Sequence, residues 1–237
     1  MIMNGYEHNT ITLEDWEAVE RYVDSTQLRF PASYLDLVNS GQFPHDAFTL
    51  GQLVSKAWLL ERLFECDIKR SPSTAVLLGS WVGTLVLPFL ERADTSWRQR
   101  QIERVYGIDT DPEAVDLGEK FNHRLVQDNW RYKGVVADCD TLDCSEMEFQ
   151  TGGELIMFKP DIVFNTSCEH MSDDWFHTCD SDQLIIMQTN DSSQYDGHIN
   201  TCSSEFEMWD KYPLSDRLFS GALVTPAYTR FMQIGYK

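Results

Sequence analysis

A chain of 237 residues with 42% hydrophobic side chains is long enough for one α/β domain of ordinary size with a modest appendage. Its 38 acidic and 19 basic residues give a net charge of −19, and such an acidic surface repels phosphate backbones, which argues against a nucleic-acid partner. No apolar run approaches membrane-spanning length and no signal peptide opens the chain, so we expect no membrane partner, a cytoplasmic location and reduced thiols for the six cysteines.

The first part of the chain predicts helices. Thr12 can cap one helix, Pro31 can begin a second, and Thr49 can cap a third. The third has a wide apolar stripe formed by Leu50, Leu53, Val54, Ala57, Trp58, Leu60 and Leu63. We interpret residues 1–72 as an N-terminal helical cap or extension, because this stretch is too short to enclose a large core of its own.

From residue 73 onward, strand-like and helix-like segments alternate, which indicates parallel βαβ units. The predicted strands are Thr74–Leu78, Arg104–Ile108, Gly134–Ala137, Asp161–Asn165 and Leu184–Gln188, with helices at Thr84–Arg92 and Asp111–Asn122. Two further runs, Gly221–Pro226 and Thr229–Tyr236, are nearly contiguous and predict an antiparallel hairpin at the sheet edge. The expected fold is therefore an α/β, Rossmann-like doubly wound domain over residues 73–237, mostly parallel with a C-terminal antiparallel hairpin.

A glycine turn follows the first predicted strand, with Gly79 and Gly83 four positions apart. Glycines allow a tight turn and a close approach of the backbone to a ligand, although such a pair can equally be a turn and nothing more. Trp81 stands where the dinucleotide fingerprint requires its middle glycine, and its ring would crowd a pyrophosphate. The turn therefore disfavours a nicotinamide or flavin dinucleotide.

An acidic residue, Asp109, ends the second predicted strand. A carboxylate at this place can accept hydrogen bonds from two ribose hydroxyls, and ligands of open α/β sheets bind outside the carboxyl ends of the strands. Asp109 lies 30 residues after Gly79, a longer interval than the roughly 20 residues of the compact pattern. Asp111 precedes Pro112 and fits a helix N-cap better than a ligand contact.

A second acidic residue, Asp138, ends the third predicted strand. It could accept a hydrogen bond from an adenine amino group, with the backbone at Cys139 facing the ring nitrogens. The alternative is a helix cap or a solvated turn, because Asp138 lies in an acid-rich stretch. The order of the glycine turn and the two acids carries more weight than any one of them.

That order resembles the class I S-adenosylmethionine-dependent methyltransferases over about Ser73–Lys237. The shared features are the glycine turn, Asp109, Asp138, the fourth strand Asp161–Asn165 and the Glu-His pair that follows, with the C-terminal hairpin. Trp81 departs from the usual three-glycine form of the first motif. The resemblance implies S-adenosyl-L-methionine as cofactor, S-adenosyl-L-homocysteine as product, and contacts from Gly79, Ser80, Trp81, Gly83, Asp109, Thr110, Asp138, Cys139 and Asn165.

The resemblance also implies methyl transfer to a small molecule, with His170 as the candidate proton acceptor. A structural histidine is an equal alternative, and methyl transfer can proceed by positioning alone. Glu169, the second candidate catalytic residue, could simply accept a hydrogen bond from a backbone amide. We expect the substrate pocket between the ends of the fourth and fifth strands, lined by Asn165, Glu169, His170 and the polar segment Tyr195–Asn200.

Two cysteine–histidine pairs, Cys168 with His170 and His177 with Cys179, flank the segment after the fourth strand. Two thiols and two imidazoles could hold zinc, but their spacing matches no common zinc pattern, so we expect no metal. Two other functions stay open at this point. One is a non-catalytic binding or scaffold protein on the same fold, and the other is an enzyme that uses S-adenosylmethionine for another group transfer.

Overall fold

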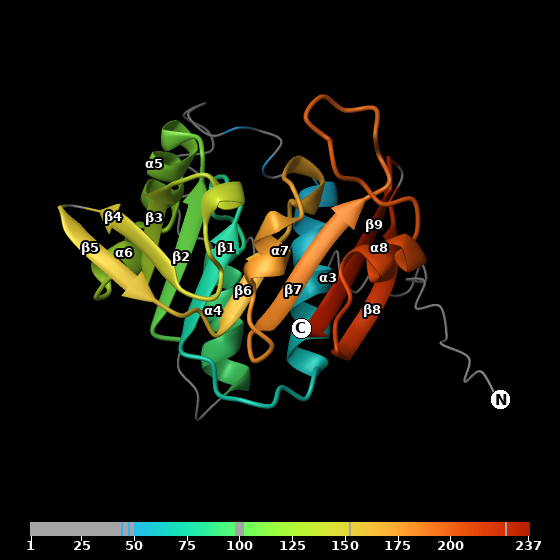
Figure 1. Cartoon of the computed structure of the whole chain (residues 1–237). Coiled ribbons are helices and arrows are strands. Elements are labelled where there is room, and N and C mark those ends of the chain that lie inside the picture. The colour runs from blue at the N-terminus through green and yellow to red at the C-terminus, as the bar shows by residue number, and fades with distance from the viewer. Residues whose placement is uncertain (1–43, 45–46, 48–49, 98–101, 152, 226) are drawn as a thin grey trace.

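The computed structural model describes residues 44, 47, 50–97, 102–151, 153–225 and 227–237 (Figure 1). Its main sheet has seven strands in the order β3-β2-β1-β6-β7-β9-β8. These strands are β1 (Thr74–Leu78), β2 (Arg104–Asp109), β3 (Tyr132–Val136), β6 (Ile162–Asn165), β7 (Leu184–Asn190), β8 (Asp216–Val224) and β9 (Thr229–Tyr236). A separate antiparallel hairpin consists of β4 (Met147–Thr151) and β5 (Glu154–Phe158).

Five neighbouring strands, from β3 to β7, run parallel, whereas β9 pairs antiparallel with both β7 and β8. The predicted mostly parallel sheet with a C-terminal antiparallel hairpin is therefore confirmed. The chain first builds outward from β1 to β3 and then returns to place β6 on the other side of β1. At such a switch point the loops leaving the two strands diverge, which opens a crevice at the carboxyl edge of the sheet.

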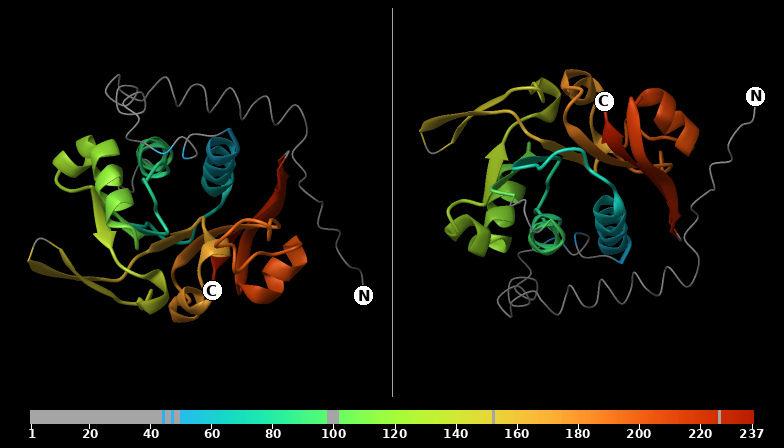
Figure 2. Two further views of the ribbon diagram at one scale, coloured as in Figure 1. Left: turned by 90° about the horizontal axis from the view of Figure 1, so that it is seen from above. Right: turned by 90° about the horizontal axis from the view of Figure 1, so that it is seen from below.

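Helices and the hairpin cover the two faces of the sheet (Figure 2). On one face lie α3 (Leu50–Glu65), α4 (Val86–Ser96), α5 (Pro112–Phe121) and α6 (His123–Gln127). On the other face lie the β4–β5 hairpin, α7 (Asp174–Thr178) and α8 (Glu205–Lys211). Among the helices that the structure describes, none is both long and apolar enough to cross a lipid bilayer.

Alternate residues of the strands enter two hydrophobic cores, one on each face. In β1, Ala75 and Leu77 pack into the core shared with α3 and α4, whereas Val76 and Leu78 pack into the core on the opposite face. Burial on both faces explains the near-continuous apolar runs of these strands. Helix α3 belongs to the first core, and Gln188 Nε2 on β7 donates to the Ser55 backbone carbonyl at 3.1 Å.

Helix α3 corresponds to the third predicted helix, which we placed in the N-terminal extension. It packs directly against the sheet of the domain expected over residues 73–237. The helices predicted at Thr12 and Pro31 lie outside the described residues. Asp111 caps α5 as predicted, because its side chain accepts a hydrogen bond from the Glu113 backbone N–H, and Pro112 is the first residue of that helix.

The β4–β5 hairpin was not predicted from the sequence. Its core-facing side chains Met147 and Phe149 are buried, but Leu155 and Met157 of β5 are exposed. Apolar residues on the solvent side remove the alternation of apolar and polar residues by which a half-buried strand is normally predicted.

Candidate functional site

A cavity of about 480 Å³ opens at the carboxyl edge of the sheet. Its volume falls within the usual range for small-molecule sites, roughly 300–1,000 Å³. Seven of the residues expected at a cofactor site line it: Gly79, Ser80, Trp81, Asp109, Thr110, Asp138 and Cys139. Because β1, β2 and β3 are parallel neighbours, their carboxyl ends bring these residues to one edge.

The turn after β1 has a strained backbone. Gly79 and Gly83 have φ values of +60° and +63°, and Trp81 between them has a φ of +48°. A bulky residue in this left-handed region is uncommon and costs free energy, of the order of 1–3 kcal/mol. The surrounding structure must therefore hold the turn in place.

Two hydrogen bonds from β2 provide this support. The Ser80 N–H donates to the Ile108 carbonyl at 2.8 Å, and the Trp81 N–H donates to Asp109 Oδ2 at 2.7 Å. The Trp81 side chain also packs against a small buried cluster of Ala47, Val82 and Phe121. Trp81 therefore belongs both to the cavity lining and to this cluster.

Asp109 keeps acceptor capacity for a ligand. Its Oδ2 accepts from the Trp81 N–H and its Oδ1 accepts from the Asp111 N–H at 3.1 Å. A carboxylate offers about four acceptor positions, so about two remain. The group lines the cavity, and a pair of neighbouring hydroxyls matches its remaining capacity.

Asp138 is both a cap and a cavity residue. It caps a short 3₁₀ helix, Cys139–Thr141, by accepting a hydrogen bond from the Asp140 N–H at 3.0 Å. Its side chain is exposed, whereas Cys139 is buried, and both line the cavity. Asp138 therefore forms the helix cap that we considered as the alternative, and it still lines the cavity.

Two expected contact residues, Gly83 and Asn165, lie outside the cavity lining. A Cβ on Gly83 would lie 2.9 Å from Asn122 Nδ2 and 3.0 Å from the Tyr132 hydroxyl, so this glycine faces protein. Asn165 is fully buried and accepts a hydrogen bond from the Ser167 N–H at 3.0 Å. Both residues shape turns whose neighbours line the cavity.

The opposite wall includes polar residues that the sequence analysis missed. Gln52 and Lys56 come from α3, and Arg230 comes from β9. Lys56 lies within the apolar stripe of a core-facing helix, between Val54 and Ala57, and Arg230 lies in a strand of buried residues. A charged residue within such an element is the signal that could have revealed them.

Glu169 and Arg230 form a buried charged pair on this wall. Their side chains are 3% and 5% exposed, and Arg230 Nη2 lies 3.5 Å from Glu169 Oε1. The same oxygen accepts a hydrogen bond from Asn190 Nδ2 at 2.6 Å. Lys56 donates to Gln52 Oε1 at 2.8 Å. Desolvation, followed by the positive charge of Arg230, lowers the pKa of Lys56 to about 7, and Glu169 opposes this shift.

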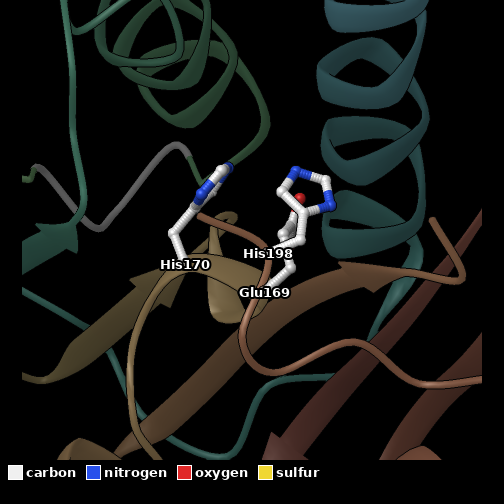
Figure 3. A group of neighbouring side chains, drawn as sticks. All are labelled: Glu169, His170 and His198. Carbon is white, nitrogen blue, oxygen red and sulfur yellow. The ribbon is translucent and has the colours of Figure 1, made fainter. Parts of the chain in front are cut away.

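Two histidine rings, those of His170 and His198, lie side by side (Figure 3). His170 is exposed and lines the cavity beside Glu169, and its ring lies 4.6 Å from that of His198 at an angle of 87°. His198 belongs to the segment Tyr195–Asn200, which we expected to line a substrate pocket. None of the described cavity-lining residues comes from that segment, and Asn200 instead donates to the Met171 carbonyl at 2.9 Å.

The four residues considered for zinc do not form a shared site. The Cys168 thiol donates to the Asn165 carbonyl at 3.5 Å, and the Cys179 thiol donates to the Trp175 carbonyl at 3.4 Å. Glu169, His170 and His198 are the group within the described ranges whose ligand atoms lie close enough together to share an ion.

No protein-family profile matches the sequence, and no curated protein matches it. Solved structures do resemble the fold. Geranyl diphosphate methyltransferase in complex with GPP and sinefungin has a TM-score of 0.53 at 12% identity, covering 78% of each chain. The N-methyltransferase NodS from Bradyrhizobium japonicum WM9 has a TM-score of 0.51 at 12% identity, covering 77% of this chain and 94% of its own. The chain therefore has the fold of these methyltransferases.

Proposed function

We propose that this protein is an S-adenosylmethionine-dependent methyltransferase acting on a small molecule. The observation that carries the proposal is the cavity at the switch point, where the glycine turn, Asp109 and Asp138 come together from three strand ends. Likeness to solved methyltransferases supports the fold on which the proposal depends. S-adenosylmethionine would supply a methyl group already activated by its sulfonium.

The residues of the β1–β3 half fit the three polar parts of this cofactor, which are the ribose, the adenine and the methionine. The acceptor positions left on Asp109 match the ribose hydroxyls. Asp138 and the backbone at Cys139 are assigned to the adenine. The turn at Gly79, Ser80 and Trp81 is assigned to the methionine end, because backbone at such a turn can approach a ligand closely.

The other half of the cavity is assigned to the substrate. Glu169 and His170 line it with Lys56 and Arg230, which makes this wall rich in charge. Its size suits a small molecule, and the acidic surface argues against nucleic acid. Where the substrate must lose a proton, Lys56 has the pKa for a base near neutral pH, about 7. His170, the proton acceptor expected from the sequence, lies on the same wall.

Calorimetry with S-adenosylhomocysteine tests the proposal directly. We expect binding, and a ligand at a hundred times its dissociation constant should stabilise the fold by about 2.7 kcal/mol in thermal or urea unfolding. Absence of both heat and a melting shift at millimolar ligand would refute the proposal.

A second measurement separates catalysis from mere binding. The protein is incubated with S-adenosylmethionine and a panel of small amines, hydroxyl compounds and carboxylates, and the product masses are compared. A methylated product supports the proposal. Tight cofactor binding without transfer across the panel would favour a non-catalytic binding protein, and a product carrying a larger group would indicate another use of the sulfonium.

A further inference from the structure

Three side chains with metal-binding atoms lie close together beside the cavity (Figure 3). Glu169 and His170 come from the 3₁₀ helix Cys168–His170 after β6, and His198 comes from the loop after β7. One ligand atom of each lies within 4.8 Å of those of the other two. The cluster lies next to the wall that we assign to the substrate, since Glu169 and His170 both line the cavity.

The Glu169 carboxylate has one oxygen without a hydrogen-bond partner. Oε1 accepts from Asn190 Nδ2 at 2.6 Å, while Oε2 is buried with no hydrogen-bond partner among the described residues. Arg230 approaches Oε1 at 3.5 Å, so it does not satisfy Oε2. Arg230 balances the charge of Glu169, but an acceptor oxygen that is buried without a donor is still costly. Oε2 is therefore an open position for a metal ion beside the two imidazoles.

The hydrogen bond of His198 prepares its ring for coordination. Its Nδ1 lies 2.5 Å from the Ser192 backbone carbonyl oxygen. A carbonyl can only accept, so Nδ1 carries the proton and Nε2 keeps a free lone pair. Metal-binding histidines typically donate their second N–H to a carbonyl or carboxylate in this way, which sets the tautomer and the ring orientation.

Asn190 links the two segments that carry these residues. Its Nδ2 donates to Glu169 Oε1, and its Oδ1 accepts from the Ser192 N–H at 2.9 Å. The backbone N–H groups of Ile199 and Asn200 both donate to the Glu169 carbonyl, at 2.9 and 3.1 Å. Hydrogen bonds thus connect the loop that carries His198 to Glu169 both before and after His198.

We propose that Glu169, His170 and His198 bind a divalent transition-metal ion. Two imidazoles and one carboxylate suit zinc, iron or nickel better than magnesium or calcium, which prefer oxygen ligands. Metal–ligand distances near 2.0–2.2 Å allow two ligand atoms to lie up to about 4.4 Å apart, close to the 4.8 Å within which these atoms lie.

The proposed site has open coordination positions. Three protein ligands leave room for water or a substrate atom, as in catalytic rather than structural metal sites. Because two of the ligands line the cavity, a substrate held there would reach these positions. We assign them to an oxygen of the substrate, a hydroxyl or a carboxylate, whose pKa the ion would lower. The proposal of metal binding does not depend on the proposed function, whereas this role of the ion in catalysis does.

This metal site differs from what the sequence predicted, which was no metal. That expectation considered His170 with Cys168, His177 and Cys179, whose thiols bond to backbone carbonyls instead. His198 lies 28 positions after His170. Its place beside Glu169 follows from the adjacent ends of β6 and β7.

Calorimetric titration with zinc chloride tests the site, using protein purified without metal-affinity resin, stripped with a chelator and kept under a mild reductant. We expect about one ion per chain. His198→Ala and Glu169→Gln should each weaken binding roughly tenfold or more, since even outer contacts are worth 10–100-fold. His177→Ala is the matched control, because His177 is an exposed histidine outside the cluster and all six cysteines remain. Its affinity should equal that of the unmodified chain.

Cobalt(II) binding followed by visible absorption gives an independent readout of the same variants, because cobalt accepts imidazole ligands as zinc does. Circular dichroism checks that each variant is folded. If Glu169→Gln does not fold, His198→Ala alone tests the metal site. Zinc binding that is absent, or equally tight in folded His198→Ala, would overturn the inference. If S-adenosylhomocysteine binds but zinc does not, the metal site alone is refuted. If zinc binds and S-adenosylhomocysteine does not, the proposed function fails and the metal site stands.

Discussion

The Asp109 carboxylate accepts a hydrogen bond from the Trp81 backbone N–H at 2.7 Å. The end of β2 thereby holds the strained turn that follows β1, although the two residues are 28 positions apart. One carboxylate thus supports the turn and still has acceptor capacity directed at the cavity.

We predict that Asp109→Ala weakens binding of S-adenosylhomocysteine roughly tenfold or more, since a hydrogen bond to a charged group contributes about 1.5–3 kcal/mol. Asp111→Ala removes only the cap of α5 and should cost about 1 kcal/mol of stability with little effect on affinity. Calorimetry and urea unfolding of both variants make the comparison. Equal affinities would show that Asp109 does not contact the ligand.

Gly83→Val should act on folding rather than on ligand contacts. Its φ of +63° disfavours a branched residue, and the new Cβ would meet Asn122 and Tyr132 at 3.0 Å or less. We expect a loss of unfolding free energy of about 1–3 kcal/mol or more, measured in urea. A variant with unchanged stability but abolished cofactor binding would show that Gly83 faces the ligand after all.

Lys56 should make stability depend on pH. Its pKa is lowered to about 7 in the folded chain and is about 10.4 when unfolded, so the unfolded chain binds more protons between these values. Stability should therefore rise with pH across this window, while the full penalty is present below pH 7. This rise in unfolding free energy should be a few kcal/mol at most, and it should be absent in Lys56→Met. Urea unfolding at pH 6 and pH 9 measures it in both chains.

Lys120→Met is the control for this measurement. Lys120 is an exposed lysine on α5 that pairs with Asp116, and such surface pairs contribute little. Its substitution should leave the pH dependence of stability unchanged. A Lys56→Met variant whose pH profile matches that of the unmodified chain would show that Lys56 is fully solvated.

His170→Ala distinguishes a metal ligand from a proton acceptor once a substrate is found. As a base, His170 should contribute roughly a hundredfold or more to turnover, with cofactor affinity nearly unchanged and no response to chelators. As a metal ligand, its loss should reduce turnover together with zinc affinity, and chelation should inactivate the unmodified chain. Because His170 is exposed, neither outcome should involve unfolding. A stable and fully active variant would remove His170 from the site.

Much of the fold could be predicted because its signals are local. Apolar runs of strand length with helical segments between them indicated the parallel sheet, and Asp111 before Pro112 indicated the start of α5. Prediction was weaker where local pattern and burial disagree, as in β5, where exposed Leu155 and Met157 conceal the alternation of a strand.

The sequence by itself also determined the β1–β3 side of the cavity. Asp109 and Asp138 follow neighbouring parallel strands, and the carboxyl ends of such strands reach the same edge whatever the details of packing. Only the tertiary structure decided the other wall. Lys56 and Arg230 come from a helix and an antiparallel strand that are far apart in the sequence, and His198 comes from a loop. Their proximity depends on which strands pair and on how Asn190 ties the loop to Glu169, and neither is encoded in local spacing.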